Sequence, residues 1–314
     1  MYIFDFRFVI FEDEIKYYEP KIKNIQTISI LHETNLLFND TINRIISEIT
    51  NHLKSLSINE YDIYSKYYKQ NLQNLLIEAP INKHLRTKPS GYIGDAELGD
   101  FITNNDYSGD NLFAKFLHKY TLETPLFLSY FQIKEHNLKN LKNIVYEKLQ
   151  TQTVVKIATI FPGYCEEILE LIKDLDQIDN CEIEIFFTNE TTLSLYKKKI
   201  EKFKTKYKKN PNIKLQTISL ASIINKEQSF MESKDIIYIS NIFEFISDVY
   251  VEKLITHLYS QLKENGIFCM THINNDSNFK SYFELGFDWF INYRTDDEIK
   301  KLLKKIEITE NNYK

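Results

Sequence analysis

The sequence predicts an α/β protein, in which a doubly wound, mostly parallel sheet follows a mainly helical N-terminal domain. In the second half of the chain, short β-branched runs alternate with longer segments of helical periodicity, the pattern of a parallel sheet with crossover helices. In the first half, apolar residues recur at helical spacing instead. A chain of 314 residues, 43% of them hydrophobic, is long enough for two domains. We place these domains at residues 1–150 and 151–314.

The first half reads as helices with one irregular stretch. Residues 1–12 alternate apolar and polar side chains and predict a short N-terminal strand. Residues 39–76 carry apolar stripes at helical spacing, and 113–128 and 138–149 predict two further helices. Between them, residues 80–95 hold two of the six prolines and two of the seven glycines. This composition is typical of a simple connector or of a tight functional loop, and both interpretations stay open.

The second half supplies the sheet. Five apolar, β-branched runs predict strands at 153–160, 183–187, 213–218, 235–239 and 267–272. Helical segments separate them, and a capping box at 295–298 predicts the start of a last helix. Small ligands of open α/β sheets bind beyond the carboxyl ends of the strands. We therefore expect a site at the loops 241–245 and 272–275.

The net charge and the number of cysteines limit the kinds of binding partner and the cellular compartment that we expect. A net charge of −5 argues against a nucleic-acid surface. Three cysteines, odd in number and far apart, fit neither a disulfide framework nor a zinc site, so we expect a reducing, cytoplasmic location and no metal. No apolar run approaches about 18 residues, so we expect no membrane span. The sequence does not predict the oligomeric state.

A cofactor is expected where the first strand turns into its helix. Backbone amides at a helix N-terminus can meet a polar ligand there. The turn contains a single glycine, Gly163, which is a weaker signal than a Gly-x-Gly-x-x-Gly loop. A ribose normally meets a carboxylate at the end of the second strand. Here that strand is followed by Thr188 and Asn189, and Glu190 is the candidate two places later.

Three separated motifs, in order along the chain, resemble one bacterial family. Residues 88–95, Lys-Pro-Ser-Gly-Tyr-Ile-Gly-Asp, are similar to its signature Lys-Pro-Arg-Gly-Tyr-Ala-Gly-Asp. Residues 241–248 resemble its Gly-Leu-Phe-Asp-Tyr-Leu-x-Asp, and 283–295 its Met-Glu-x-x-x-Asp-Trp-x-Leu-x-Tyr-Arg-Thr. The turn at 163–167 is similar to its Gly-Pro-Cys-Arg-Glu. This is a group of S-adenosylmethionine (SAM)-dependent methyltransferases, the extracellular-factor (3-hydroxypalmitic acid methyl ester) biosynthesis family.

The resemblance implies a Rossmann-like, class I methyltransferase fold, SAM as cofactor and a small-molecule acceptor such as a fatty-acid-like carboxylate. The residues that it and the loop positions assign to the cofactor are Gly163, Glu167, Glu190 and Asn241. Those assigned to catalysis, as bases toward a hydroxyl or amine acceptor, are Glu244, His272 and Asp95. Those assigned to the acceptor are Tyr92, Glu284, Tyr293 and Arg294, with Arg294 pairing with Glu284 or with an anionic acceptor.

Departures from the family pattern keep a second interpretation open. Thr188 stands where the family has the aspartate expected to hold the ribose, and Asn241 replaces a motif glycine. The alternative is a catalytically inactive protein of the same fold that binds another ligand or a protein partner. Individual assignments have structural alternatives as well. His272 could be a packed, hydrogen-bonded histidine, and residues 293–294 could form a structural corner with a buried ion pair.

Overall fold

The computed structural model describes residues 28–89, 94–161, 166–225, 233–274 and 279–308. The predicted strand at 1–12 lies outside these residues. The chain forms two compact units, described separately below. The helical unit contains residues 1–93, 100–129 and 276–290, and the sheet unit contains residues 94–99, 130–275 and 291–314. The expectation from the sequence was one boundary near residue 150, whereas these units interleave along the chain.

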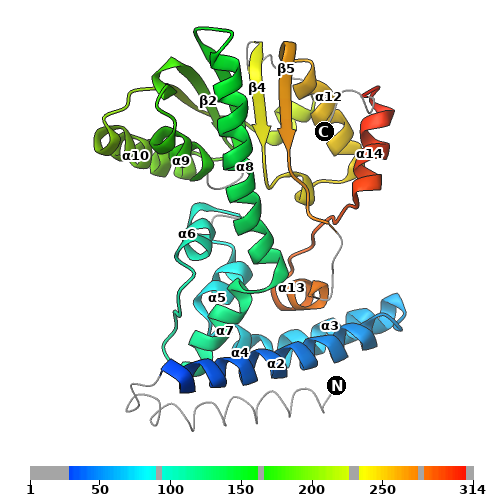
Figure 1. The fold of residues 1–314 in the computed structure, drawn as a ribbon. Helices are drawn as coiled ribbons and strands as arrows, with labels where there is room; N and C mark the ends of the chain where they lie inside the picture. Colours follow the sequence, from blue (N-terminus) through cyan, green and yellow to red (C-terminus); the bar gives the residue numbers. More distant parts are fainter. Residues whose placement is uncertain (1–27, 90–93, 162–165, 226–232, 275–278, 309–314) are drawn as a thin grey trace. The chain divides into compact units, whose positions relative to one another are not determined.

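The helical unit is built from α-helices (Figure 1), and buried aromatic side chains pack in its core. Its helices are α2 (Ile28–Leu53), α3 (Ile58–Asn71), α4 (Gln73–Leu76), α5 (Pro80–Thr87), most of α6 (Ala96–Asn104), α7 (Leu112–Leu122), the start of α8 (Pro125–Leu149) and α13 (Lys280–Phe287). Ser57 begins α3 with a capping box to Glu60, and Pro80 occupies the first turn of α5. Phe38 packs against Phe113 and Phe116 at the centre of this core.

A predicted helix is split at Pro125. The sequence predicted one helix over 113–128 and another over 138–149, but α7 ends at Leu122 and α8 runs from Pro125 to Leu149. Proline lacks the amide hydrogen that a helix interior needs, while its fixed φ suits the first helical position. Pro125 therefore begins a 25-residue helix, of which the predicted 138–149 segment is only the second half.

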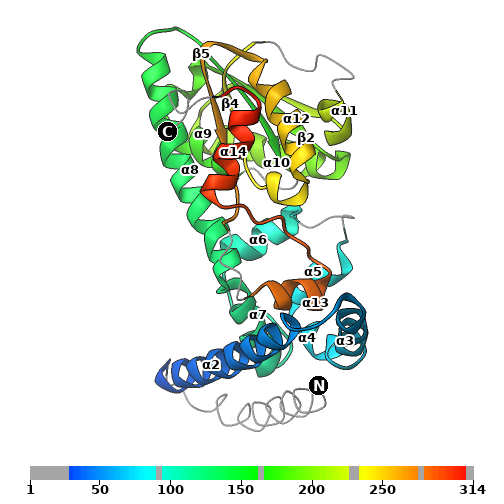
Figure 2. The same ribbon diagram turned by 90° about the vertical axis from the view of Figure 1, so that its right-hand side faces the viewer.

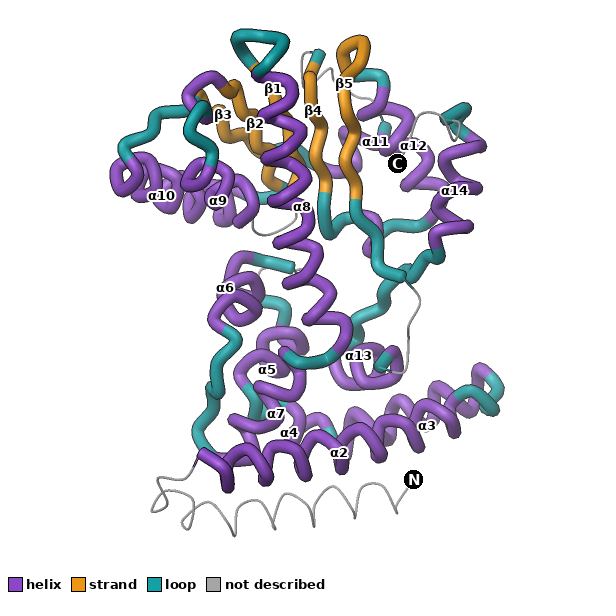
Figure 3. The backbone as a smooth tube through the Cα atoms, viewed as in Figure 1, coloured by secondary structure: helices purple, strands orange, loops and turns teal. Residues whose placement is uncertain are grey.

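The sheet unit confirms the predicted doubly wound parallel architecture. Its strands are β1 (Val155–Phe161), β2 (Cys181–Phe187), β3 (Asn212–Thr217), β4 (Lys234–Ile239) and β5 (Leu262–Met270). They are all parallel, in the order β3-β2-β1-β4-β5 (Figure 3). After β3 the chain returns to place β4 beside β1. The strand order therefore reverses between β1 and β4, where open α/β sheets bind their ligands.

Helices cover both faces of this sheet. Side chains from α8, α9 (Glu166–Asp174) and α10 (Glu190–Tyr207) pack on one face. The other face is covered by α11 (Leu220–Ile224), α12 (Asp248–Tyr259) and α14 (Asp296–Lys305). In Figure 1, α9 and α10 lie to the left of β4 and β5, and Figure 2 brings α12 and α14 to the front. Because both faces are buried at the centre of the sheet, residues 236–239 of β4 form a buried apolar run, whereas the edge strands β3 and β5 are partly exposed and carry polar residues.

The strand β5 begins earlier than the sequence indicates. Asn265 and Gly266 suggested a helix end followed by a strand at 267–272, yet β5 starts at Leu262. Its pairing with β4 shifts register, because Lys234 pairs with Leu262 whereas Ile236 pairs with Ile267. Such an irregularity absorbs extra residues, and the positive φ of Asn265 fits it. The residues that suggested a break therefore form a bulge inside the strand.

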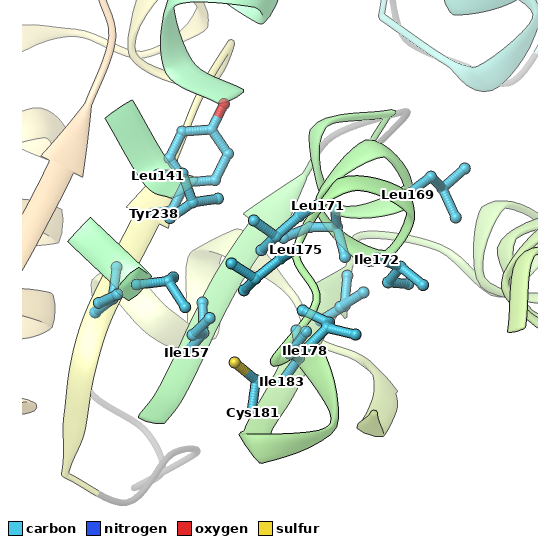
Figure 4. Close-up of a cluster of buried hydrophobic side chains, with 14 of the residues drawn as sticks. Leu141, Ile157, Leu169, Leu171, Ile172, Leu175, Ile178, Cys181, Ile183 and Tyr238 are labelled. Atoms are coloured by element: carbon cyan, nitrogen blue, oxygen red, sulfur yellow. The ribbon is translucent and has the colours of Figure 1, made fainter. Parts of the chain in front are cut away.

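Two cysteines lie in the sheet core. Figure 4 shows Cys181 among the aliphatic side chains that α9 and β2 contribute to one face. Burial raises the pKa of the Cys181 thiol to about 12 and that of Cys269 to about 11. Neither thiol is therefore a nucleophile at neutral pH.

None of the helices in the described part of the chain combines the length and the apolar character that crossing a membrane requires.

Candidate functional site

The loop that follows β4 begins with a left-handed residue. Asn241 has φ 58°, and its amide donates to Thr271 Oγ1 at 3.3 Å. Glycine occupies this position in the motif that the sequence resembles. Asparagine adopts the left-handed region more readily than most other side-chain-bearing residues. The Asn241 substitution thus preserves the turn that brings the next residues to the carboxyl end of the sheet.

Glu244 lies in the short 3-10 turn (Phe243–Phe245) of this loop and is 1% exposed. One carboxylate oxygen, Oε1, accepts a hydrogen bond of 3.1 Å from the Tyr130 hydroxyl. The other, Oε2, is buried and has no hydrogen-bond partner among the described residues. Burial raises the pKa of Glu244 to about 7, against the lowering effects of Tyr130 and Arg294. Such a carboxyl group can exchange a proton near neutral pH, as a general acid or base must.

Arg294 holds the Glu244 loop in place. Its guanidinium donates to the carbonyl oxygens of Phe243 and Ile246, both at 2.6 Å, and its Nε lies 2.9 Å from Asp248 Oδ1. The ion-pair partner is therefore Asp248, where the sequence suggested Glu284 or an anionic acceptor. The Arg294 side chain is 4% exposed. An acceptor could meet this guanidinium only if some of these bonds rearranged.

The rest of the 292–294 segment is attached to the same loop. The backbone amide of Asn292 donates to the Glu244 carbonyl at 2.8 Å. His272 contacts this segment through Nδ1, which lies 3.1 Å from the Arg294 carbonyl, and its Nε2 lies 3.4 Å from Oδ1 of Asp296 at the start of α14. Tyr293 is half-buried beside them. The second and third sequence motifs thus form one hydrogen-bonded corner beyond β4 and β5.

Glu167 lies in the first turn of α9, beyond the carboxyl end of β1, and is 2% exposed. Its Oε1 accepts a hydrogen bond of 2.9 Å from the Tyr238 hydroxyl, and that hydroxyl accepts one of 3.0 Å from the Asn137 side-chain amide. Sequence reasoning missed Tyr238 and Asn137. The available signal was a single tyrosine within the otherwise aliphatic end of β4.

Glu190 begins α10 beyond the carboxyl end of β2. Asn189 is the N-cap of this helix, because its side chain accepts from the Thr192 amide at 2.8 Å. The Glu190 carboxylate is exposed and accepts a hydrogen bond of 2.6 Å from Thr217, the last residue of β3. Glu190 therefore presents a solvent-accessible carboxylate at the edge where a ribose would lie in a fold of this type.

Asp95 caps α6. Its Oδ1 accepts a hydrogen bond of 3.0 Å from the Leu98 amide, and the side chain is buried. Gly94 before it has φ +101°, a conformation that side-chain-bearing residues rarely adopt. This backbone requirement explains the second glycine of the 88–95 motif. Two other predicted site residues, Tyr92 and Gly163, lie outside the described residues.

Glu284 belongs to α13 of the helical unit. It is half-buried, with Lys280 Nζ at 3.6 Å and a hydrogen bond from Tyr61. Burial raises the pKa of Glu284, and these two partners oppose the increase. The structure therefore places Glu284 in a different unit from Arg294.

Asp288, directly after α13, is in contact with three basic side chains. Lys69 Nζ lies 2.6 Å from Asp288 Oδ1, Arg86 forms an ion pair with Oδ2, and Lys88 donates to the Asp288 carbonyl at 3.0 Å. Lys88 belongs to the first resemblance motif and Asp288 to the third. The two motifs are therefore joined within the helical unit, and a structural contact accounts for these residues.

Among known proteins, similarity was found to solved structures and not to protein families or curated sequences. No protein-family model matches the chain, and no curated protein matches its sequence. A solved structure described as "a possible exported protein from Bordetella parapertussis" has a TM-score of 0.55 and 13% identity, over 90% of this chain and 92% of that chain. The likeness extends over almost the whole protein, so the helical N-terminal region and the sheet occur together in a known fold. With the parallel sheet and its flanking helices, this supports the predicted Rossmann-like architecture.

Two more distant matches cover the chain only in part. Magnesium protoporphyrin IX methyltransferase from Synechocystis, solved with bound S-adenosylhomocysteine, has a TM-score of 0.40 and 11% identity over 55% of this chain and 71% of that one. The methyltransferase domain of the citrinin polyketide synthase has a TM-score of 0.42 and 11% identity. That match covers 54% of this chain and 45% of the other, so it spans less than half of the synthase domain.

Proposed function

We propose that the protein is a SAM-dependent methyltransferase that acts on a small-molecule acceptor. The observation that carries the proposal is the placement of three carboxylates at one edge of the sheet. Glu167, Glu190 and Glu244 follow β1, β2 and β4, respectively, around the point where the strand order reverses. Ligands of open α/β sheets bind at this edge. The motif resemblance to the extracellular-factor family supports the same activity.

The residues at this edge fit the polar groups of SAM. Glu167 would accept the ammonium group of the amino-acid part, and Glu190 would accept a ribose hydroxyl. Gly163 and Asn241, which follow β1 and β4 in the sequence, are proposed to line the cofactor. When bound, SAM supplies a sulfonium methyl group that a nucleophile can displace. Among the described residues, no three or more His, Cys, Asp or Glu side chains come together in a group that could hold a metal ion.

Glu244 is the proposed base toward the acceptor. Its raised pKa lets it accept a proton from a hydroxyl or an amine near neutral pH. A carboxylate acceptor, as in the resembling family, needs positioning but no base. Asp95 and His272 are alternative bases, although Asp95 caps a helix and His272 uses both ring nitrogens in contacts within the protein. Tyr92, Glu284, Tyr293 and Arg294 remain proposed acceptor contacts.

The test is a calorimetric titration of the full chain with SAM and with S-adenosylhomocysteine. We expect micromolar affinity, about −8 kcal/mol. Glu190→Ala should weaken binding about tenfold, since it removes a hydrogen-bond acceptor for the ribose. Glu201→Ala, at another exposed glutamate of α10, is the matched control and should bind as the wild type does. Unchanged affinity in Glu190→Ala would remove this residue from the site.

A second candidate function follows from Thr188, which stands where the resembling family has its ribose aspartate. A catalytically inactive descendant would keep the fold but bind another ligand or a protein partner. The absence of heat with either ligand at millimolar concentration would contradict the methyltransferase proposal and favour this candidate. The cytoplasmic location and the lack of a nucleic-acid partner stay predictions.

A further inference from the structure

Tyr238 places a polar group in the otherwise aliphatic second half of β4, residues 236–239. The side chains of β4 alternate between the two faces of the sheet, with Ile236 and Tyr238 in the core beside α9 and Ile237 and Ile239 in the core on the other face. Tyr238 is 2% exposed, and Figure 4 shows its ring next to Leu141 of α8. Core packing accounts for the ring. It does not account for the hydroxyl, which phenylalanine would lack.

The hydroxyl belongs to a directed chain of hydrogen bonds. It accepts from Asn137 of α8 at 3.0 Å and donates to Glu167 Oε1 at 2.9 Å. Burial, together with the nearby Glu167 charge, raises the pKa of Tyr238 well above its usual value, so the phenol stays protonated and remains a donor. A phenol is a neutral donor. It therefore fixes the orientation of the Glu167 carboxylate without neutralising its negative charge.

A second polar group lies beside this chain. Thr159 of β1 pairs in register with Tyr238, and because it lies two residues after Ile157 its side chain is on the same face of the sheet. Thr159 is completely buried, and its Oγ1 has no hydrogen-bond partner among the described residues. A buried hydroxyl without a partner is unfavourable. A polar ligand group near the carboxyl ends of β1 and β4 would provide one.

We propose that Tyr238, held by Asn137, positions the Glu167 carboxylate to receive the ammonium group of a ligand that carries an amino-acid moiety. This inference rests on the proposed function and deepens it, since it gives the carboxylate proposed for the amino-acid end of the ligand its positioning residues. The phenol occupies one acceptor position of this carboxylate. An ammonium group at another forms a charge-assisted hydrogen bond whose geometry depends on the orientation of the carboxylate.

The experiment compares two ligands that differ only at this end. S-adenosylhomocysteine carries the amino-acid group, whereas 5′-methylthioadenosine is the corresponding nucleoside thioether without it. Both are titrated into the full chain and into the variants Tyr238→Phe, Glu167→Gln and the double variant. Tyr196→Phe, another fully buried tyrosine in the same core, is the matched control. Thermal melts show that each variant is folded at the temperature of the titration.

We expect Tyr238→Phe to weaken S-adenosylhomocysteine binding about tenfold and to leave methylthioadenosine binding unchanged, while the Tyr196→Phe control binds both as the wild type does. The double variant should be no weaker than Glu167→Gln alone, because Tyr238 acts through Glu167. An equal loss for both ligands, or no loss for either, overturns the inference. A wild-type protein that binds neither ligand overturns the proposed function and this inference together.

Discussion

The loop that carries Glu244 in the sheet unit and the end of α13 that carries Asp288 in the helical unit each hold a carboxylate, but they surround it differently. Asp288 receives hydrogen bonds from the cations Lys69 and Arg86. Glu244 receives one from the neutral Tyr130 hydroxyl and is more deeply buried. At both groups, burial by itself acts to raise the pKa of the carboxyl. At Asp288 the two cations outweigh it and hold the pKa below its usual value, whereas at Glu244 burial prevails.

The difference separates a structural carboxylate from a functional candidate. A carboxylate that forms ion pairs with cationic side chains stays ionised and stabilises the contacts around it, as Asp288 does between α3, α5 and α13. A buried carboxylate with too few hydrogen-bond donors lowers the stability of the fold, and such destabilising groups are typical of catalytic sites. Three substitutions test this distinction.

The largest effect is expected from releasing the Glu244 loop. Arg294→Lys should lower the free energy of unfolding by about 3 kcal/mol, because lysine cannot reproduce a planar, buried guanidinium that bonds two carbonyls and a carboxylate. Urea denaturation measures the change. Arg44→Lys, at an exposed position of α2, should differ from the wild type by less than about 0.5 kcal/mol. Equal stability of the two variants would show that Arg294 does not hold the loop.

Glu244→Gln sharpens the comparison through pH. The folded pKa of about 7 exceeds the unfolded value near 4.5, so the stability that this carboxyl contributes is complete below about pH 4.5 and is lost as the pH rises through 7. We expect the amide variant to be more stable than the wild type at pH 8, by about 2 kcal/mol, and the difference to shrink at pH 5. Thermal melts at both pH values measure it. The exposed Glu264→Gln should show no such trend.

Asp288→Asn should give a smaller effect with the opposite pH dependence. Asparagine tolerates the left-handed backbone of this position, φ 51°, so the substitution isolates the charge. Because the folded pKa is lowered, the stability that Asp288 contributes is present above its unfolded pKa and is lost as the pH falls through the folded value. We expect a loss of about 1 kcal/mol at pH 7 and less at high salt, since the group is partly exposed. A loss that persists in acid would contradict the ionic account.

Local patterns were enough to predict the sheet. All five strands were recognised from short apolar, β-branched runs, because a parallel strand inside a doubly wound sheet buries side chains on both faces. The errors occurred where one residue can support two structures. Pro125 can interrupt a helix or begin one, and Asn265–Gly266 can end a helix or form a bulge. Such choices depend on partners elsewhere in the chain.

The candidate site was predicted as a set of loop positions and not as a set of contacts. The resemblance motifs and the position after β4 indicated Glu244, but Tyr130, its hydrogen-bond donor, is 114 residues away in sequence. The contact between Tyr238 and Glu167 spans 71 residues. Residues separated in this way share no periodicity or spacing. Their proximity follows from the strand order and from the helix that packs across it, which only the folded chain reveals.

The position of α13 has a consequence for the order in which the chain can fold. This helix packs against α2, α3 and α5. Its Tyr282 hydroxyl also joins Asn82 and Thr121 in a buried hydrogen-bonded triangle, with distances of 3.1 and 2.7 Å from the hydroxyl. During synthesis, α13 emerges only after every strand of the sheet has been made. The helical unit therefore cannot complete its core as a nascent N-terminal fragment, and residues 1–150 expressed alone would expose the apolar surface that α13 covers, which favours aggregation.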